Sequence, residues 1–273
     1  MDRTNLQSRK TMPHWTTLEV GTTAPHVLRI CLNRPDQRNA ISTVLVEELL
    51  ECVTRLQHAA DVRVVVLTGR GTAFCAGGDL KERLAAGPSQ ARRQRDTLLR
   101  VIEQIDRLPM PVIAMINGPA MAGGLELALA CDLRIAGTSA SFALSEVRTV
   151  GAFPGAGAPV RLAKLIGRGR ASLLTLTGRT FSSEEAFSLG LVEVVVPDTA
   201  LQRETDAIAS DIASASPAGV RAARQLIRRS VDIDTDAAME LSCALRNPLD
   251  DTADAQEGMA AWREKRQPKF TGA

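Results

Sequence analysis

The chain has 273 residues and a net charge of +2, because 33 Lys and Arg are nearly balanced by 31 Asp and Glu. This balance, with no Tyr and 3% aromatic residues, argues against the basic excess of a dedicated nucleic-acid-binding protein and against surfaces that stack single-stranded bases. No apolar run approaches the roughly 20 residues of a membrane span, and the N-terminal MDRTNLQSRKTMPHW lacks the apolar core of a signal peptide. We therefore expect a cytoplasmic protein with no nucleic acid and no membrane among its partners.

Short β-branched runs alternate with stretches of helical periodicity up to about residue 197. Several of the runs are apolar on both faces, which is typical of parallel strands covered on two sides. The predicted strands are residues 27–32, 62–68, 112–116, 133–136 and 192–196. The predicted helices between them are residues 42–58, with Ser42 as the cap, 92–108, 123–130 and 159–165. This alternation predicts an α/β fold with crossover connections.

The C-terminal part of the chain has a different pattern. After Pro197 no further strand is predicted, and residues 201–213, 217–229, 236–245 and 252–265 all have the pattern of helices. We therefore predict a strand-and-helix core over residues 1–197 and a C-terminal helical region over residues 198–273. Within the core, residues 85–95 (AAGPSQARRQR) combine Gly, Pro and Ser with a run of charges, and we expect a mobile surface loop there.

Histidine and cysteine are poorly placed for chemistry. The three histidines, His14, His26 and His58, lie in the first quarter of the chain, and neither H-E-x-x-H nor G-x-S-x-G is present. The five cysteines are scattered without a C-x-x-C pair, so we expect buried thiols in a reducing compartment rather than disulfides or metal ligands. Acid–base chemistry would then fall to carboxylates, with no metal.

Two glycine-rich turns each follow a predicted strand and precede a predicted helix. They are residues 71–81 (GTAFCAGGDLK) and 117–126 (NGPAMAGGLE). Glycines let backbone amides point outward, and a helix start adds its own unpaired N–H groups. Two such turns on neighbouring strands could direct two N–H groups at one oxygen, as in an oxyanion hole. Taken alone, the glycine pattern favours tight turns that have no further role.

Several longer segments resemble one family. In chain order they are CLNRPDQRNAIS, TGRGTAFCAGGDLK, INGPAMAGGLELALACDLRIA, SFALSEVRTVGAFPGAGAPVRL, TGRTFSSEEAFSLGLVEVVVP and EGMAAWREKRQPKF. From about residue 18 to the C-terminus the chain resembles the enoyl-CoA hydratase/isomerase (crotonase) superfamily. The resemblance implies a crotonase-like α/β spiral of strand–strand–helix units, with a C-terminal helical region that packs across subunits in a homotrimer or a hexamer (a dimer of trimers).

The resemblance also implies roles for individual residues. Gly78 and Gly123 match the two oxyanion-hole amides, and Glu126 and Glu146 match the two catalytic glutamates of the hydratases. The residues that match contacts to coenzyme A are Arg34, Arg38, Ala40, Ala76, Lys81, Lys269 and Phe270, the last two from a segment that often reaches a neighbouring subunit's CoA. Coenzyme A would arrive as part of an acyl-CoA thioester substrate, so no separate cofactor is implied.

The second glutamate has an alternative register. The spacing from Phe142 to Glu146 fits the family, but the segment from Glu146 to Pro154 is one residue longer than the common pattern. Counting back from Pro154 would move the register of the glutamate off Glu146 by one residue, and Ser145 is the neighbouring polar alternative. SEVR could also simply cap a helix.

Glu126 has the clearest physical signature of function. An acidic residue in the first turn of a helix is favoured by the helix dipole for structural reasons alone. Leu125, Leu127, Ala128 and Leu129 nevertheless surround it with apolar residues, and a lone ionisable group in a buried helix is costly without a purpose. Asp79 and Asp132, by contrast, lie where capping or turn roles are expected.

Three functions remain open at this stage. The first is hydration of a 2-trans-enoyl-CoA to a 3-hydroxyacyl-CoA through an oxyanion-stabilised enolate, with both glutamates sharing the proton transfers. The second is enoyl-CoA isomerisation or another enolate reaction that needs only Glu126. The third is acyl-CoA binding without turnover.

Overall fold

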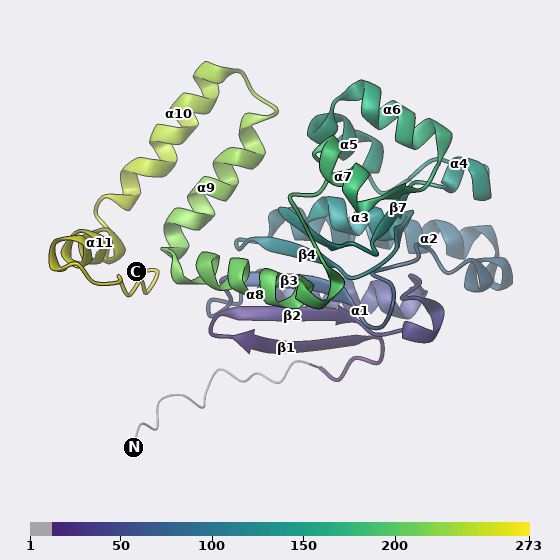
Figure 1. Ribbon diagram of the computed structural model, residues 1–273, viewed down its shortest axis with the longest axis horizontal. Coiled ribbons are helices and arrows are strands. Elements are labelled where there is room, and N and C mark those ends of the chain that lie inside the picture. The colour runs from purple at the N-terminus through teal and green to yellow at the C-terminus, as the bar shows by residue number, and fades with distance from the viewer. Residues whose placement is uncertain (1–12) are drawn as a thin grey trace.

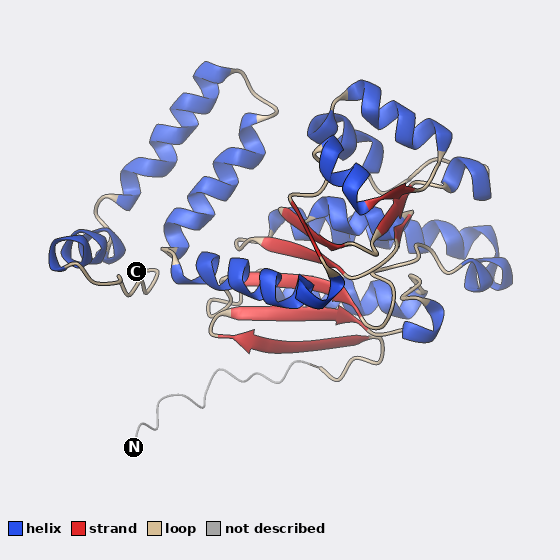
Figure 2. Ribbon diagram, viewed as in Figure 1, coloured by secondary structure: helices blue, strands red, loops and turns tan. Residues whose placement is uncertain are grey.

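The computed structural model describes residues 13–273. Most of the N-terminal segment MDRTNLQSRKTMPHW, which is expected not to be a signal peptide, therefore lies outside the described residues. A six-stranded sheet runs through its centre in the order β1-β2-β3-β4-β6-β9 (Figures 1 and 2). Its strands are β1 Leu18–Ala24, β2 Val27–Leu32, β3 Val64–Gly69, β4 Val112–Ile116, β6 Leu133–Gly137 and β9 Val194–Val196. β1 is antiparallel to β2 and all other neighbours are parallel. The predicted α/β class is confirmed, with β1 as an additional edge strand.

A second, smaller sheet lies beside the first, and its strand β5 is part of the second glycine-rich turn, residues 117–126. It has the order β5-β7-β8, formed by β5 Ala120–Met121, β7 Ser141–Ala143 and β8 Phe181–Ser182. Isolated bridges join Cys75 to Ala120 and Ile41 to Gly78. The segment after β3 and the segment after β4 are thereby held next to one another.

Helices pack on both faces of the large sheet and continue beyond it towards the C-terminus. They are α1 Thr43–Leu56, α2 Leu80–Arg107, α3 Gly123–Ala130, α4 Glu146–Thr149, α5 Ala158–Ile166, α6 Arg168–Thr177, α7 Ser183–Leu189, α8 Asp198–Ser214, α9 Pro217–Ser230, α10 Thr235–Arg246 and α11 Ala253–Glu264. The main core lies between the sheet and helices α1, α2, α3, α5 and α6. Within residues 13–273, no helix combines the length and the apolar character needed to cross a membrane.

The predicted loop at residues 85–95 is wrong, because these residues belong to helix α2. Gly87 alone leaves helical geometry (φ 79°, ψ 178°), and Pro88 follows it. A proline ring has the backbone angle of a first helical turn, so Pro88 starts a second helical segment instead of ending the first. Gln94 and Leu98 then fix this segment by burial against the core.

Helix α8 is part of the central core rather than of a separate C-terminal unit. Leu201, Ala209 and Ala213 pack against Val64 and Ile113 on the second face of the sheet, and Figure 1 shows α8 lying across that face. The hydrophobic core shared by the chain therefore includes all of α8, beyond the predicted boundary at residue 197.

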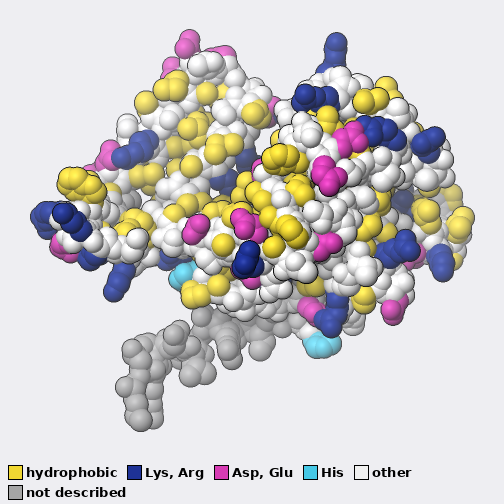
Figure 3. Space-filling view, in the orientation of Figure 1, with side chains coloured by type: hydrophobic (Ala, Val, Ile, Leu, Met, Phe, Trp, Pro, Cys, Tyr) yellow, Lys and Arg dark blue, Asp and Glu magenta, His cyan; other side chains and the backbone are white. Residues whose placement is uncertain are grey.

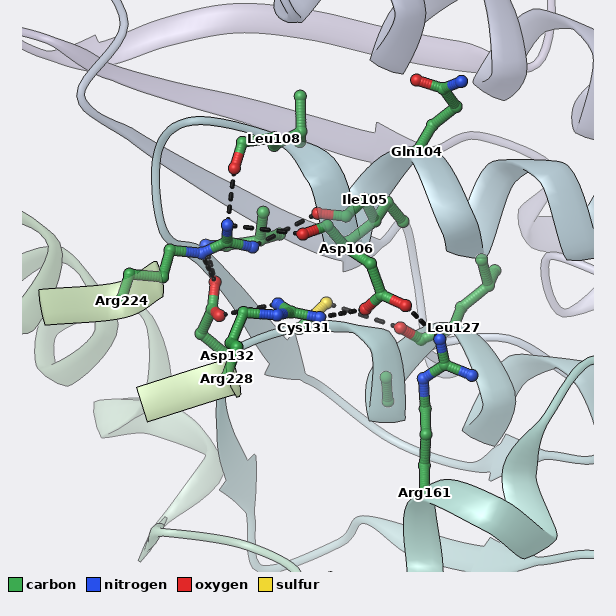
Figure 4. Close-up of polar contacts among 12 residues, drawn as sticks. Gln104, Ile105, Asp106, Leu108, Leu127, Cys131, Asp132, Arg161, Arg224 and Arg228 are labelled. Atoms are coloured by element: carbon green, nitrogen blue, oxygen red, sulfur yellow. Dashed lines mark hydrogen bonds and ion pairs between the residues drawn. The ribbon is translucent and has the colours of Figure 1, made fainter. Parts of the chain in front are cut away.

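Helices α9, α10 and α11 form an arm that projects from this core (Figure 1). Two arginines of α9 attach it (Figure 4): Arg224 Nε donates to Asp132 at 2.8 Å, and Arg228 pairs with both Asp132 and Asp106. Asp106 also pairs with Arg161 of α5. Asp132 accepts the amide of Val112 as well, so this predicted turn residue is also the anchor of the arm.

The arm keeps large apolar side chains in contact with solvent. Neither α9 nor α10 has a buried residue, and Figure 3 shows apolar side chains spread over these helices. The exposed apolar residues of the arm are Ile227, Val231, Ile233, Met239, Met259 and Trp262.

Candidate active site

The two glycine-rich turns lie side by side. The amide of Cys75 donates to the Pro119 carbonyl at 3.1 Å, and the amide of Met121 donates back to the Cys75 carbonyl at 2.9 Å. A Cβ on Gly124 would lie 2.3 Å from the Cys75 carbonyl oxygen, so only glycine allows this approach. The close packing predicted for the two turns is thus present in the fold.

The amides of Gly78 and Gly123 are available to a ligand. Gly123 is the first residue of α3, where helical N–H groups lack an intrahelical acceptor. Within residues 13–273, neither amide donates to an acceptor. A Cβ on Gly77 would lie 3.5 Å from the Gly123 nitrogen, which places the Gly77–Gly78 backbone next to the start of α3. The amides of Gly78 and Gly123 are therefore unused donors on adjacent backbone segments. Their convergence on one oxygen stays a prediction.

Glu126 is a buried carboxyl held by backbone. Every residue of α3 is buried, and Glu126 is 3% exposed. Its Oε1 accepts the amides of Ala156 at 2.7 Å and Ala158 at 3.2 Å. Burial raises its pKa to about 7 against the opposing effect of these amides, the charge of Glu146 raises it further, and Arg161 lowers it. The carboxyl can therefore hold or release a proton near neutral pH.

Glu146 lies at the same site. It is the first residue of α4, and its buried Oε2 has no hydrogen-bond partner within residues 13–273. Burial raises its pKa, while its own backbone amide and the charge of Arg83 lower it. Its charge acts on Glu126 and raises the pKa of that carboxyl, so the protonation state of Glu146 affects Glu126.

The structure favours Glu146 over Ser145 as the second polar group. The Ser145 carbonyl accepts the amides of Arg148 and Thr149, and its side chain makes no cap to the helix. The chain then bends at Gly151, which has a positive φ of 64°, before it reaches Pro154. The longer spacing ahead of Pro154 therefore leaves Glu146 in electrostatic contact with Glu126.

The residues predicted to contact coenzyme A divide into two groups. Arg34 pairs with Asp79 at 3.0 Å and donates to the Ala40 carbonyl, so it fixes its own loop. Asp79 in turn caps α2, as predicted. Arg38 and Lys81 are exposed, with no ion-pair partner in the described part of the chain. These two cations remain free for phosphate groups.

Ala76 contributes through its backbone. Its amide donates to the Arg38 carbonyl at 3.0 Å, next to the contact between the Ile41 amide and the Gly77 carbonyl at 2.7 Å. These bonds join the loop before α1 to the first glycine-rich turn.

Lys269 and Phe270 lie away from this site. The amide of Lys269 donates to Glu257, and the Phe270 carbonyl accepts from Arg63. In Figure 1 the C-terminus and α11 lie at the opposite end of the molecule from α2 and α4. A contact between these two residues and coenzyme A would therefore need a second subunit.

One charged residue of the site was not predicted from the sequence. Arg83 of α2 is half-buried, and its guanidinium lies against Gly78. The motif CAGGDLK ends before it. The only sequence signal was a basic residue on the first turns of the helix that follows the turn.

Cysteine chemistry and metal ligation have no visible place in the site. Cys52, Cys75 and Cys131 are buried, and burial raises the pKa of each thiol to about 12. Cys243 is exposed, contrary to the expectation of buried thiols. Among residues 13–273, no three His, Cys, Asp or Glu side chains gather in a way that could hold a metal ion.

Comparison with known proteins agrees with this geometry. The family model described as enoyl-CoA hydratase/isomerase matches residues 22–273. Human enoyl-CoA hydratase domain-containing protein 2, mitochondrial, is 42% identical over 254 residues, covering 90% of this chain and 86% of the relative. The (E)-benzylidenesuccinyl-CoA hydratase of Thauera aromatica is 39% identical over 261 residues, covering 94% and 99%.

Solved structures give the same result. The crystal structure of an enoyl-CoA hydratase from Bacillus anthracis has a TM-score of 0.92 and 43% sequence identity, covering 94% of this chain and all of that one. The chain therefore belongs to the enoyl-CoA hydratase/isomerase family of the crotonase superfamily, which acts on acyl-CoA thioesters.

Proposed function

We propose that the protein is an enoyl-CoA hydratase, which adds water to a 2-trans-enoyl-CoA and gives a 3-hydroxyacyl-CoA. The observation that carries this proposal is the pair Glu126 and Glu146, a buried carboxyl and a half-buried one whose Oε2 is buried, in the part of the fold that holds two unused backbone donors. Isomerisation requires proton transfer by Glu126 alone, whereas hydration uses both carboxyls. A buried Oε2 of Glu146 without a protein partner favours hydration, because a water molecule can occupy that position.

The amides of Gly78 and Gly123 polarise the thioester. Both donate to the thioester oxygen as negative charge develops there, and the intermediate is an enolate. Each such donor typically contributes on the order of 3 kcal/mol to stabilisation of the transition state. The same polarisation makes Cβ electrophilic, since the double bond is conjugated with the carbonyl.

The two carboxyls complete the proton balance. Burial raises the pKa of Glu126 to about 7 and also raises that of Glu146, and we assign a single proton to the pair in the reactive state. The ionised carboxylate removes a proton from water as oxygen bonds to Cβ, and the protonated carboxyl delivers its proton to Cα. The water gives its OH to Cβ and leaves its second proton on the carboxylate, while the proton added at Cα comes from the other carboxyl, so the product gains one H2O in net and the pair still holds a single proton.

The remaining part of the substrate binds through charge. Arg38 and Lys81 border the two turns and supply exposed cations for the phosphates of coenzyme A. Coenzyme A is thus the part of the substrate that these cations bind, and not a separate cofactor. Backbone bonds from Ala76 and Ala40 keep this border in register with the turn.

A substrate panel tests the proposal. Purified protein is incubated with short, long, branched and aromatic 2-enoyl-CoAs, and both the conjugated thioester absorbance and the product mass are followed. A mass gain of one water supports hydration, unchanged mass with migration of the double bond identifies isomerisation, and the absence of any conversion indicates a binding protein. Glu146→Gln should lower hydration by about 10²- to 10⁴-fold and leave acyl-CoA affinity intact, whereas turnover near the wild-type rate would remove Glu146 from the mechanism.

The exposed apolar surface of the arm supports assembly into a homotrimer or a hexamer built from two trimers. Trp262 is 79% exposed and Met259 is 69% exposed, and contiguous apolar surface of this kind is typical of an interface. Packing across subunits would also bring Lys269 and Phe270 to a neighbour's site. A monodisperse monomer at micromolar concentration in size-exclusion chromatography with light scattering would contradict this assembly.

A further inference from the structure

Arg83 occupies a position that only glycine at residue 78 permits. A Cβ on Gly78 would lie 2.5 Å from the guanidinium carbon of Arg83 and 2.9 Å from its Nε. Arg83 is on the first turns of α2, whose cap is Asp79, and its side chain points back along the helix over Gly78. The cation therefore lies directly beside one of the two amides proposed to hold the thioester oxygen.

A buried glutamine fixes the orientation of this guanidinium. Arg83 Nε donates to Gln94 Oε1 at 2.7 Å, and Gln94 is 2% exposed. Gln94 Nε2 donates to the Glu82 carboxylate at 3.3 Å, which accepts the amide of Thr43 at 3.0 Å. Within the described part of the chain, neither terminal nitrogen of Arg83 has a hydrogen-bond or ion-pair acceptor. Gln94 thus holds one edge of the planar guanidinium of Arg83, while the other edge, with the two terminal nitrogens, is open to a ligand.

The charges around Arg83 do not neutralise it. Glu146, Glu82 and Asp79 act on it from a distance, and Arg95 adds a second positive charge on the same side. Burial is the largest influence and lowers the pKa of Arg83 from its ordinary value. A half-buried cation without an ion pair of its own is costly unless a ligand supplies the partner.

The Arg95 side chain borders the same part of the site. A Cβ on Gly155 would lie 2.7 Å from Arg95 Cδ, and the next residue, Ala156, donates its amide to Glu126. Two arginines of α2 therefore border this part of the site, Arg83 beside Gly78 and Arg95 beside Gly155, and Arg95 is itself paired with Asp96.

We propose that the open edge of Arg83 binds a second carboxylate carried by the acyl group, so that the preferred substrates are short 2-trans-enoyl-CoAs with a carboxylate on the acyl chain. This inference rests on the proposed function and specifies its substrate class. A guanidinium fork matches a carboxylate with two parallel hydrogen bonds, which a hydroxyl or an alkyl group cannot form. Because Arg83 lies next to Gly78, the carboxylate must be a few atoms from the thioester, which limits the acyl group to a short chain.

The test compares two substrates that differ in charge but hardly in shape. They are 4-carboxybut-2-enoyl-CoA and its neutral amide, 4-carbamoylbut-2-enoyl-CoA, assayed with wild type, Arg83→Met and Arg83→Lys. Arg100→Met is the matched control, because Arg100 is exposed on the same helix. We expect wild type to favour the carboxylate, Arg83→Met to reduce the ratio of kcat/KM for carboxylate over amide by about 100-fold, Arg83→Lys to reduce it less, and Arg100→Met to leave the ratio unchanged.

Two outcomes would overturn the proposal. If Arg83→Met lowers kcat/KM for both substrates equally, Arg83 acts only by positioning Glu146. If wild type does not prefer the carboxylate, the open edge serves no acyl carboxylate.

A binding measurement separates this inference from the proposed function. Calorimetry with the saturated thioesters, 4-carboxybutanoyl-CoA and its amide, measures recognition without turnover. If no enoyl-CoA is hydrated but the carboxylate binds more tightly in an Arg83-dependent manner, the function fails and the assignment of Arg83 stands. Equal affinities for acid and amide would refute the assignment whatever the activity.

Discussion

Replacing Glu126 by Gln should stabilise the fold at alkaline pH while it abolishes most turnover. The pKa of Glu126 is about 7 in the folded protein against an ordinary value of 4.5, so the folded state holds this proton more tightly than the unfolded chain. The stability contributed by the proton is complete below about pH 4.5 and is lost as the pH rises through 7. At 1.36 kcal/mol per pKa unit, ionisation of Glu126 costs the fold about 3 kcal/mol at pH 8.

Glutamine avoids this cost because it stays neutral, and its side-chain oxygen can still accept the amides of Ala156 and Ala158. Urea unfolding of wild type and Glu126→Gln at pH 5 and pH 8 measures the effect. The variant should come within about 1 kcal/mol of wild type at pH 5 and exceed it by up to about 3 kcal/mol at pH 8. Glu103→Gln, on the exposed face of α2, should not reproduce this pH dependence. A difference between Glu126→Gln and wild type that is the same at both pH values would refute the argument.

The other expectations concern pH, the two turns and the arm. The charge of Glu146 contributes to the pKa of about 7 of Glu126. Hydration should therefore fall above pH 7, where the pair loses its last proton, and fall again in acid, where both carboxyls are protonated. A pH–rate profile of kcat/KM without two limbs would argue against a shared proton. Gly124→Ala places a Cβ 2.3 Å from the Cys75 carbonyl oxygen. We expect this substitution to separate the two turns and to lower both Tm, measured by calorimetry, and kcat, measured in the hydration assay. Wild-type values of both would show that the close approach is dispensable. Asp132→Asn removes the charge that anchors α9 and should cost about 3 kcal/mol of stability and expose the arm to limited proteolysis, while an unchanged cleavage pattern would place the anchor elsewhere.

The buried elements could be predicted from the sequence because their residue patterns are unambiguous. Residues 27–32, 112–116 and 123–130 have the bounds expected of them, since apolar runs with short turns between them allow few alternatives. β1, by contrast, was not predicted, because the stretch LEVGTTA has a Gly and two exposed Thr and becomes a strand only by pairing with β2.

The polar parts of the molecule were less predictable, because their roles depend on contacts that are distant in sequence. Gly87 and Pro88 indicated a loop, and only the burial of Gln94 shows why a helix resumes there. Asp132 had the signature of a turn residue, yet two arginines more than 90 positions away bind it. Likewise, its apolar neighbours made Glu126 a candidate functional residue in the sequence, but nothing local showed that Arg83 would lie over Gly78.

Asp106 divides its two carboxylate oxygens between separate parts of the chain. One oxygen binds Arg228 of α9 and the other binds Arg161 of α5, and Arg161 lies close enough to lower the pKa of Glu126. Asp106 thus connects the projecting helices, through Arg228, with the arginine that acts on Glu126. A protein cut back to residue 214, which keeps α8 and removes α9 to α11, would lose Arg228 from Asp106, so the shortened chain should differ from the intact protein in its acid–base behaviour as well as in its stability.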